Sequence, residues 1–484
     1  MITLNNMNDN NLMPFWSVNQ NGKIDLNNYL FKKFLEKYDY FKNKPNANST
    51  FNIIKKNGIF LEIKDETDLK DFILTHIEQN DLGIGVYNLM SGNLKYFKRD
   101  FLSMISTKEI QVMKDDKDNA YFFYNNCIVN ITKDERKIID YKDVNISIWK
   151  KQVINRDFIE ADHHQSQFRT FVWKVSGEDV ERYNTLQSVL GYLLHSYKTN
   201  SNNRAIIFND EMISDNPNGR SGKGLIWNAL KQIKNVQSLD GKTFTFNKSF
   251  PYQNVSTDCQ ILVFDDVERN FSFESLFSVI TEGICIEYKG KDAIRLSVEE
   301  SPKIIITTNY TIKGDGGSHE ARKFEVEMST FFNADYTPEM FFGNKLFNDW
   351  DKQEWARFDN YMMECLRKYL NNGLVRSNTK NLEIRKLIDK ISAELHTFIP
   401  SIPNNEWVNV KTIYDNFLNA YPELRKWYKQ NSLTIGLKSY AKHYGVKYHT
   451  TTAGGITKIM FEASKSYNNE EQKDIWDSTE LQGL

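Results

Sequence analysis

The chain has 484 residues, which is too long for one compact core, so we expect two to four domains. Its 62 basic and 63 acidic residues nearly balance, so bulk charge does not indicate a nucleic-acid partner. The four cysteines are widely spaced without a CxxC pair, which disfavours disulfides and a zinc site. No window approaches 18 apolar residues and no signal-peptide pattern is present, so we expect a cytoplasmic protein without membrane contact.

Residues 1–179 mix helical periodicity with short alternating runs, which predicts an α+β accessory domain. Two helices and two hairpins are expected in it, the helices at 26–37 and 67–78 and the hairpins at 51–63 and 121–132. His163 and His164 could form a ligand pair, but adjacent side chains face different ways. A surface or capping pair is therefore the favoured interpretation.

A glycine-rich loop, N-P-N-G-R-S-G-K-G, spans 216–224. The stretch 177–198 predicts a helix before it, and 205–208 predicts a buried strand that leads into it. Glycines let backbone N–H groups turn toward phosphates, and a lysine reaches the terminal phosphates of a nucleotide. The expected nucleotide-binding residues are Gly219, Arg220, Ser221, Gly222, Lys223, Gly224 and Leu225.

Paired carboxylates, Asp265 and Asp266, follow the apolar run 261–264. Parallel α/β sheets place ligand chemistry at the carboxyl ends of such strands. We expect Asp265 and Asp266 to serve Mg²⁺, and Asp266 also to orient the attacking water. Gly224 replaces the Ser or Thr that usually offers a hydroxyl to Mg²⁺, so the carboxylates must supply more of the coordination. The alternative is an exposed acidic turn after a core strand.

A second buried strand, at 304–307, is followed by Asn309, whose amide could contact a γ-phosphate or position water. Arg322 comes after the glycine-rich stretch 314–317 and is a candidate arginine finger for a neighbouring subunit. A turn asparagine and a surface arginine are the corresponding alternatives.

The segment 284–296 alternates apolar and polar residues around Lys289, Gly290 and Lys291, which predicts a hairpin. In a ring of subunits, Lys289 and Lys291 could reach the phosphate backbone of DNA in a central pore. A solvated turn is an equally good interpretation on spacing alone.

Residues 373–463 predict a separate small domain of helices followed by a hairpin at 446–461, consistent with a winged-helix arrangement. We expect its helices at 382–398, 410–421 and 433–443. Its basic residues would be Lys438, Lys442 and His443 on a helix and Lys447 and Lys458 on the wing. A small helical cap without DNA contact is an equal alternative. Residues 464–484 predict a flexible acidic tail.

The order G-R-S-G-K-G, I-L-V-F-D-D, I-E-Y-K-G-K-D and K-I-I-I-T-T-N within 204–332 resembles the superfamily three helicases, AAA+-like motors of viruses, phages and plasmids. It looks most like their poxvirus and phage primase-helicase group. The resemblance implies an α/β fold with an AAA+-like P-loop ATPase core at 180–372. It also implies a hexameric ring that uses ATP and Mg²⁺ to separate strands of single-stranded or forked DNA during replication.

By that resemblance, each predicted site residue takes a role in the ATPase cycle. Lys223 would bind phosphate, and Asp265 and Asp266 would serve Mg²⁺ and hydrolysis. Asn309 would be the sensor residue and Arg322 the arginine finger. Lys289 and Lys291 would form the basic pore hairpin. Two other classes stay open: another P-loop ATPase such as a packaging motor or kinase, and a DNA-binding regulatory protein with a weakened ATPase. No primase carboxylate motif is present, which disfavours a fused priming activity.

Overall fold

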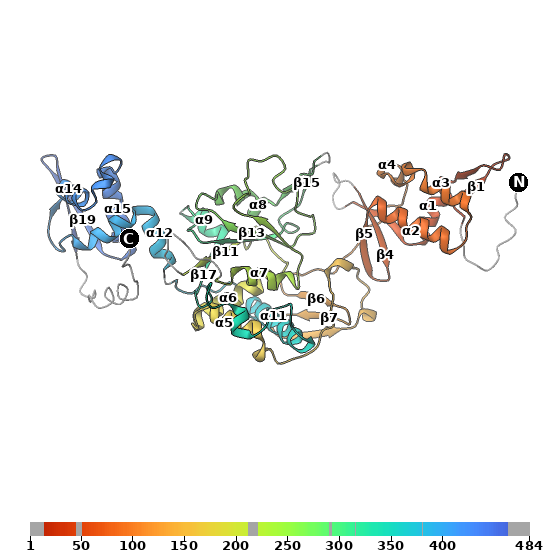
Figure 1. The fold of residues 1–484 in the computed structure, drawn as a ribbon, viewed down its shortest axis with the longest axis horizontal. Helices are drawn as coiled ribbons and strands as arrows, with labels where there is room; N and C mark the ends of the chain where they lie inside the picture. Colours follow the sequence, from red (N-terminus) through yellow and green to blue (C-terminus); the bar gives the residue numbers. More distant parts are fainter. Residues whose placement is uncertain are drawn as a thin grey trace.

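The structure is a computed structural model, and it describes residues 14–44, 51–211, 221–289, 293–314, 316–379 and 381–462. The amino-terminal part of the chain, a central parallel sheet and the carboxyl-terminal part follow one another along the longest axis (Figure 1). Among the described residues, no helix has both the length and the apolar composition to cross a membrane.

The amino-terminal part is built around its own aromatic core, in which Phe15, Phe31 and Phe34 are fully buried. Its helices are α1 (Asn28–Lys37), α2 (Glu66–Gln79), α3 (Ile84–Ser91) and α4 (Arg99–Leu102). Its strands are β1 (Trp16–Val18), β2 (Ile24–Leu26), β3 (Tyr40–Asn43), β4 (Asn52–Asn57), β5 (Phe60–Lys64) and β9 (Ile148–Trp149). Strands β3, β4, β5 and β9 form one sheet in that order. The two predicted helices and the first predicted hairpin are confirmed.

A second sheet lies in the order β10-β6-β7-β8. Its strands are β6 (Ala120–Tyr124), β7 (Ile128–Ile131), β8 (Arg136–Ile139) and β10 (Val153–Ile154), and helices α5 (Gln167–Val175) and α6 (Val180–Leu194) follow. The hairpin predicted at 121–132 and the helix predicted at 177–198 are confirmed. Buried Phe122 and Phe171 share one hydrophobic cluster with Ile206 of the parallel sheet. The core therefore continues across position 179, where the predicted domain boundary lies.

The central sheet has five parallel strands in the order β12-β13-β16-β11-β17. They are β11 (Ala205–Asp210), β12 (Val236–Asp240), β13 (Ile261–Val267), β16 (Lys303–Thr308) and β17 (Lys323–Met328). Alternate residues pack into different clusters, Ile206 on one face and Ile207 on the other, because successive side chains of a strand point to opposite faces. The α/β class with a buried parallel sheet is confirmed, and β16 lies between β11 and β13.

Helices and a strand pair connect and cover this sheet. The helices are α7 (Lys223–Lys231), α8 (Phe277–Glu282), α9 (Gly317–Arg322), α10 (Pro338–Phe342) and α11 (Lys352–Asn372). The pair β14 (Cys285–Ile286) and β15 (Ile294–Arg295) is antiparallel, which confirms the hairpin expected at 284–296. Helix α11 packs against α6 beneath the sheet (Figure 1).

The carboxyl-terminal part has a core of its own, and its antiparallel sheet has the order β18-β20-β19. Its elements are α12 (Leu382–Ile391), α13 (Ala393–Phe398), β18 (Val408–Asn409), α14 (Val410–Ala420), α15 (Gln430–His443), β19 (Lys447–Ala453) and β20 (Ile456–Glu462). The single helix expected at 382–398 is wrong, because Ser392 has φ 81° and separates α12 from α13. The winged-helix assignment and the domain boundaries stay predictions.

Candidate nucleotide site

Helix α7 begins at the glycine loop, with Gly222 immediately before Lys223. Gly222 has φ +93°, and a Cβ at this position would lie 2.7 Å from the Phe171 ring. Only glycine meets both conditions, since L side chains rarely adopt this φ and the aromatic ring leaves no space. This turn aims the amino end of α7, and therefore Lys223, at the carboxyl ends of the strands.

Lys223 is held between two strand ends. Its Nζ donates to a carboxylate oxygen of Asp210, the last residue of β11, and to the amide oxygen of Asn309 at 2.6 Å. The Asn309 amide nitrogen in turn donates to Asp266 Oδ1 at 3.3 Å. Burial lowers the pKa of Lys223, and the Asp210 carboxylate opposes that shift. Three predicted site residues, Lys223, Asp266 and Asn309, thus form one connected network.

The two carboxylates of β13 are turned by an irregularity in the strand. The pairing of β13 with β16 shifts register between Phe264 and Val267, and Asp266 has φ +56°. Thr307 of β16 fixes this turn, because its hydroxyl donates to Asp265 Oδ1 at 2.7 Å and accepts from the Asp266 N–H at 2.7 Å. Asp265 is thereby oriented by a neighbouring strand.

A cleft of about 510 Å³ opens over these groups, within the range typical of ligand pockets. It is lined by Ser221, Gly222, Lys223, Gly224, Leu225, Asn228, Asp265, Asp266, Thr307, Asn309, Thr337 and Pro338. Two buried oxygens at this end of the sheet, Ser221 Oγ and Asp210 Oδ1, have no hydrogen-bond partner among the described residues. Buried polar atoms normally have partners, so these oxygens fit a site that receives a polar ligand.

The residues present fit Mg²⁺ and a nucleotide. Oxygen ligands such as carboxylates suit Mg²⁺, and Asp265 and Asp266 line one cleft with Ser221, whose hydroxyl has no partner among the described residues. A Cβ at Gly224 would meet only Trp227 Nε1, at 4.0 Å, so a side chain could be accommodated there. The missing hydroxyl at Gly224 is therefore not imposed by packing.

Sequence reasoning missed Arg385 of α12, which joins two strand ends from outside the predicted ATPase region. Its guanidinium donates to the Asp210 carbonyl at 2.8 Å and to the Asn309 carbonyl. Glu327 of β17 accepts from the backbone N–H groups of Asn381 and Leu382 at the start of α12, each at 2.9 Å. Helix α12 is thus fastened to β11, β16 and β17.

Asp210 was also missed, although it comes soon after the predicted strand 205–208, much as the paired carboxylates follow the run 261–264. The signal that identified Asp265 and Asp266 could therefore have found it. Arg385 carries no comparable signal, because nothing in the local sequence of α12 indicates contact with the sheet.

The candidate finger and pore residues lie elsewhere. Arg322 ends α9, where its guanidinium donates to the Ser318 carbonyl at 2.9 Å and lies 4.6 Å from the Phe277 ring centroid. Arg322 is not one of the described residues that line the cleft. Lys289 is exposed at the hairpin, whereas Gly219, Arg220 and Lys291 lie outside the described residues. The roles of these residues stay predictions.

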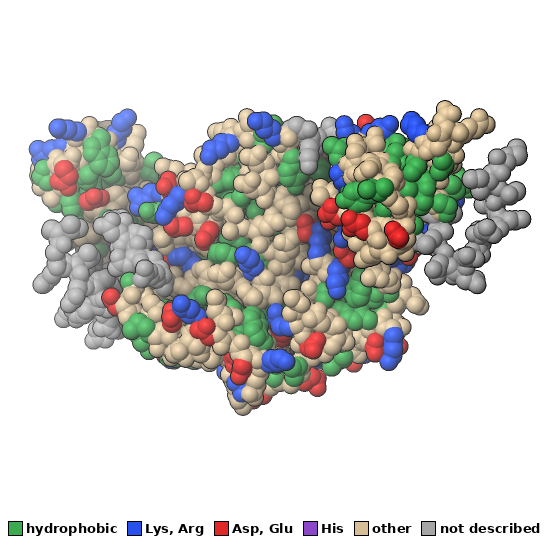
Figure 2. Space-filling model, turned by 45° about the vertical axis from the view of Figure 1, so that its right-hand side comes forward, with side chains coloured by type: hydrophobic (Ala, Val, Ile, Leu, Met, Phe, Trp, Pro, Cys, Tyr) green, Lys and Arg blue, Asp and Glu red, His purple; other side chains and the backbone are tan. Residues whose placement is uncertain are grey.

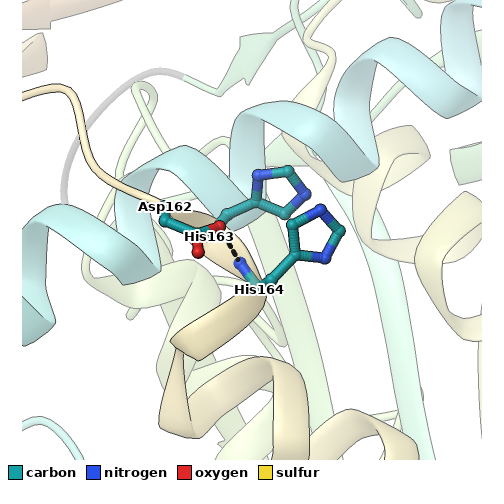
Figure 3. Close-up of side chains that lie close together, drawn as sticks. All are labelled: Asp162, His163 and His164. Carbon is teal, nitrogen blue, oxygen red and sulfur yellow. Dashed lines mark hydrogen bonds between the residues drawn. The ribbon is translucent and has the colours of Figure 1, made fainter.

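The histidine pair lies on a short turn after the second sheet (Figure 3). Asp162 caps this turn by accepting from the His164 N–H at 3.0 Å, and the two imidazole rings lie 4.2 Å apart. Ligand atoms of Asp162, His163 and His164 come within 4.8 Å of one another, close enough to hold a metal ion. The capping contact accounts for Asp162, so the interpretation of the histidines as a surface or capping pair remains sufficient.

No protein-family model matches the sequence, and no curated protein matches it. Among solved structures, the A form apo structure of the NrS-1 C-terminal region is 12% identical with a TM-score of 0.32, covering 71% of this chain and 97% of that one. JCV helicase is 12% identical with a TM-score of 0.22, covering 48% and 71%. The Aeropyrum pernix ORC1 protein in complex with DNA is 9% identical with a TM-score of 0.21, covering 62% and 94%. Likeness this low carries no functional assignment, which depends on the site.

Proposed function

We propose that this chain is an ATP-driven DNA helicase of the AAA+-like, superfamily three type, which acts as a ring of identical subunits. The observation that supports it most is the network from Lys223 through Asn309 to Asp266 at the carboxyl end of a parallel sheet. Many P-loop enzymes could share this network. The sequence resemblance over 204–332, with its basic hairpin, directs the proposal to DNA.

In the proposed reaction, ATP is the substrate and Lys223 leaves Asp210 to contact its terminal phosphates. Asp266, held by the Asn309 amide, orients the attacking water, and Asn309 responds to the loss of the γ-phosphate. Bound Mg²⁺ would neutralise charge on the phosphate oxygens, and Asp265 and Asp266 would hold it. Asn309 contacts both Lys223 and Asp266, so one side chain links phosphate binding to hydrolysis.

ATP hydrolysis by Lys223→Met tests the ATPase proposal. We expect kcat/KM to fall by roughly 100-fold or more, as when a donor to transition-state charge is removed. Lys231→Met is the matched control, because Lys231 is exposed at the far end of the same helix. Equal activity in Lys223→Met and Lys231→Met would show that Lys223 does not serve nucleotide chemistry.

Two further measurements test the ring and the DNA. Mixing Lys223→Ala subunits with Arg322→Ala subunits should restore hydrolysis if Arg322 completes a neighbour's site, whereas a kinase-like monomer would gain nothing.

Lys289→Ala/Lys291→Ala should abolish separation of forked DNA while ATP binding is retained. Undiminished strand separation in that variant would contradict the pore assignment.

A further inference from the structure

The segment 424–461, which contains α15 and the hairpin β19–β20, has no acidic residue although 63 occur in the chain. Its basic residues are Arg425, Lys426, Lys429, Lys438, Lys442, Lys447 and Lys458. The chain as a whole is close to neutral, so this segment concentrates positive charge. Local positive potential of this kind attracts polyanions even when net charge is near zero.

Helix α15 presents one exposed polar face. Asn431, Ile435, Lys438 and Lys442 recur at helical spacing and are all exposed, whereas Leu433 and Leu437 on the opposite side are fully buried. The exposed fraction of Ile435 is 60%, so an apolar side chain stands among the polar ones. This face therefore has the composition of a contact surface and is not covered by the rest of the described chain.

Most lysines of this region have no partner among the residues that the structure describes. Lys426, Lys429, Lys438, Lys442 and Lys458 form no ion pair or side-chain hydrogen bond with any residue in the described part of the chain. By contrast, the hairpin's other lysine, at 447, pairs with Glu462 at 2.9 Å. Unpaired ammonium groups can each meet a phosphate without first breaking an internal bond.

An exposed tryptophan precedes the helix. Trp427 is 64% exposed and lies in the sequence between Lys426 and Lys429, shortly before α15 begins at Gln430. Helix α15 packs against β19, so the helix and the hairpin form one unit with their own core. Lys and Arg side chains are visible along the upper outer edge of this part of the molecule (Figure 2).

We propose that this α15 surface, meaning Asn431, Ile435, Lys438 and Lys442 with Lys426, Trp427 and Lys429 beside them, binds duplex DNA. A helix of this size fits the major groove, which is about 12 Å wide. Lysine and asparagine side chains donate to phosphates and base edges, and Ile435 offers an apolar contact to thymine methyl groups. The surface lies on a separate core from the nucleotide cleft, so duplex binding needs no ATP.

Equilibrium binding of the full chain to a short blunt-ended DNA duplex, without nucleotide, tests whether the α15 surface binds duplex DNA. The full chain carries Lys289→Ala/Lys291→Ala throughout, so that the proposed pore contact does not contribute. In this background, Lys438→Glu/Lys442→Glu is compared with the control Lys133→Glu/Lys352→Glu, which makes the same charge change at two exposed lysines elsewhere. Fluorescence anisotropy at several salt concentrations gives affinity and salt dependence, and thermal melting checks that each variant folds.

We expect Lys438→Glu/Lys442→Glu to weaken duplex binding at least ~10-fold and to reduce the slope of log affinity against log salt by about 2, one per lost phosphate contact. The control should change affinity less than ~2-fold. Equal losses in both variants, or no loss in either, would overturn the proposal. Tighter binding to single-stranded DNA of the same composition would also overturn it. None of these outcomes depends on ATP hydrolysis, so the helicase proposal is tested separately.

Discussion

Both ends of the central parallel sheet bury lysines, but the two ends satisfy them differently. At the carboxyl end, Lys223 bonds to the side chains of Asp210 and Asn309. At the amino end, Lys303 begins β16 and donates to the main-chain carbonyls of Tyr192 and His195. Burial lowers the pKa of Lys303 well below its usual value.

A second lysine at the amino end, Lys198, shows the same arrangement. It donates to the carbonyls of Glu299 and Ser301, and burial lowers its pKa to about 8. Side-chain partners can rotate away and give place to ligand oxygens, whereas main-chain carbonyls are fixed by the fold. A buried lysine therefore does not by itself mark a ligand site, and the nature of its partners decides.

The largest effect is expected from Arg385→Ala, which removes the group that fastens α12 to the carboxyl end. It leaves the Asp210 and Asn309 carbonyls without this donor, and we expect the free energy of unfolding to fall by about 3 kcal/mol. Urea denaturation measures the free energy of unfolding. ATP hydrolysis by the same variant should also fall, even at urea concentrations too low to unfold it. Arg385→Lys, which keeps the charge, should recover part of the stability and part of the ATP hydrolysis. An unchanged stability in Arg385→Ala would mean that α12 docks without this contact.

Asp210→Asn tests whether the partners of Lys223 are exchangeable. Removing the carboxylate frees Lys223 and reduces repulsion of the phosphates, so we expect a fluorescent ATP analogue to bind roughly 10-fold tighter at neutral pH. Titration with the analogue gives the dissociation constant. Weaker binding would instead indicate that Asp210 positions Lys223 for the phosphates.

At the amino end of the sheet, the contribution of Lys198 to the free energy of unfolding should depend on pH. Since the pKa of Lys198 is lowered from 10.5 to about 8, the unfolded chain binds more protons than the folded chain between these values. The free energy of unfolding should therefore rise with pH, by about 1 kcal/mol between pH 7 and 9 from this group. Lys198→Met should lose that increment in denaturation curves at the two pH values. Identical pH dependence in both proteins would contradict the assignment.

The smallest effect is expected from Gly224→Ser, which offers a hydroxyl where the structure leaves space. The Mg²⁺ concentration for half-maximal hydrolysis should fall roughly threefold. Gly222→Ala serves as the opposite control, since Phe171 and a positive φ leave no room there, and it should lose activity. An unchanged Mg²⁺ requirement in Gly224→Ser would place the metal away from the start of α7.

The strands and most of the candidate site could be predicted from local sequence. Continuous apolar runs at 205–208, 261–264 and 304–306 predict buried parallel strands, and all three occur. Polar residues that follow such runs lie at one edge, because parallel strands end on the same side of a sheet. Asp265, Asp266 and Asn309 could therefore be assigned to the same place as Lys223.

Which strand ends are neighbours, and which other residues reach them, depends on long-range packing. The order that puts β16 between β11 and β13 arises from how the connections pack, and local sequence does not encode it. Arg385 arrives from a helix beyond the predicted ATPase region, and its bonds to the Asp210 and Asn309 carbonyls depend on long-range docking. The connections among side chains, and hence the partners of Lys223, follow from that packing.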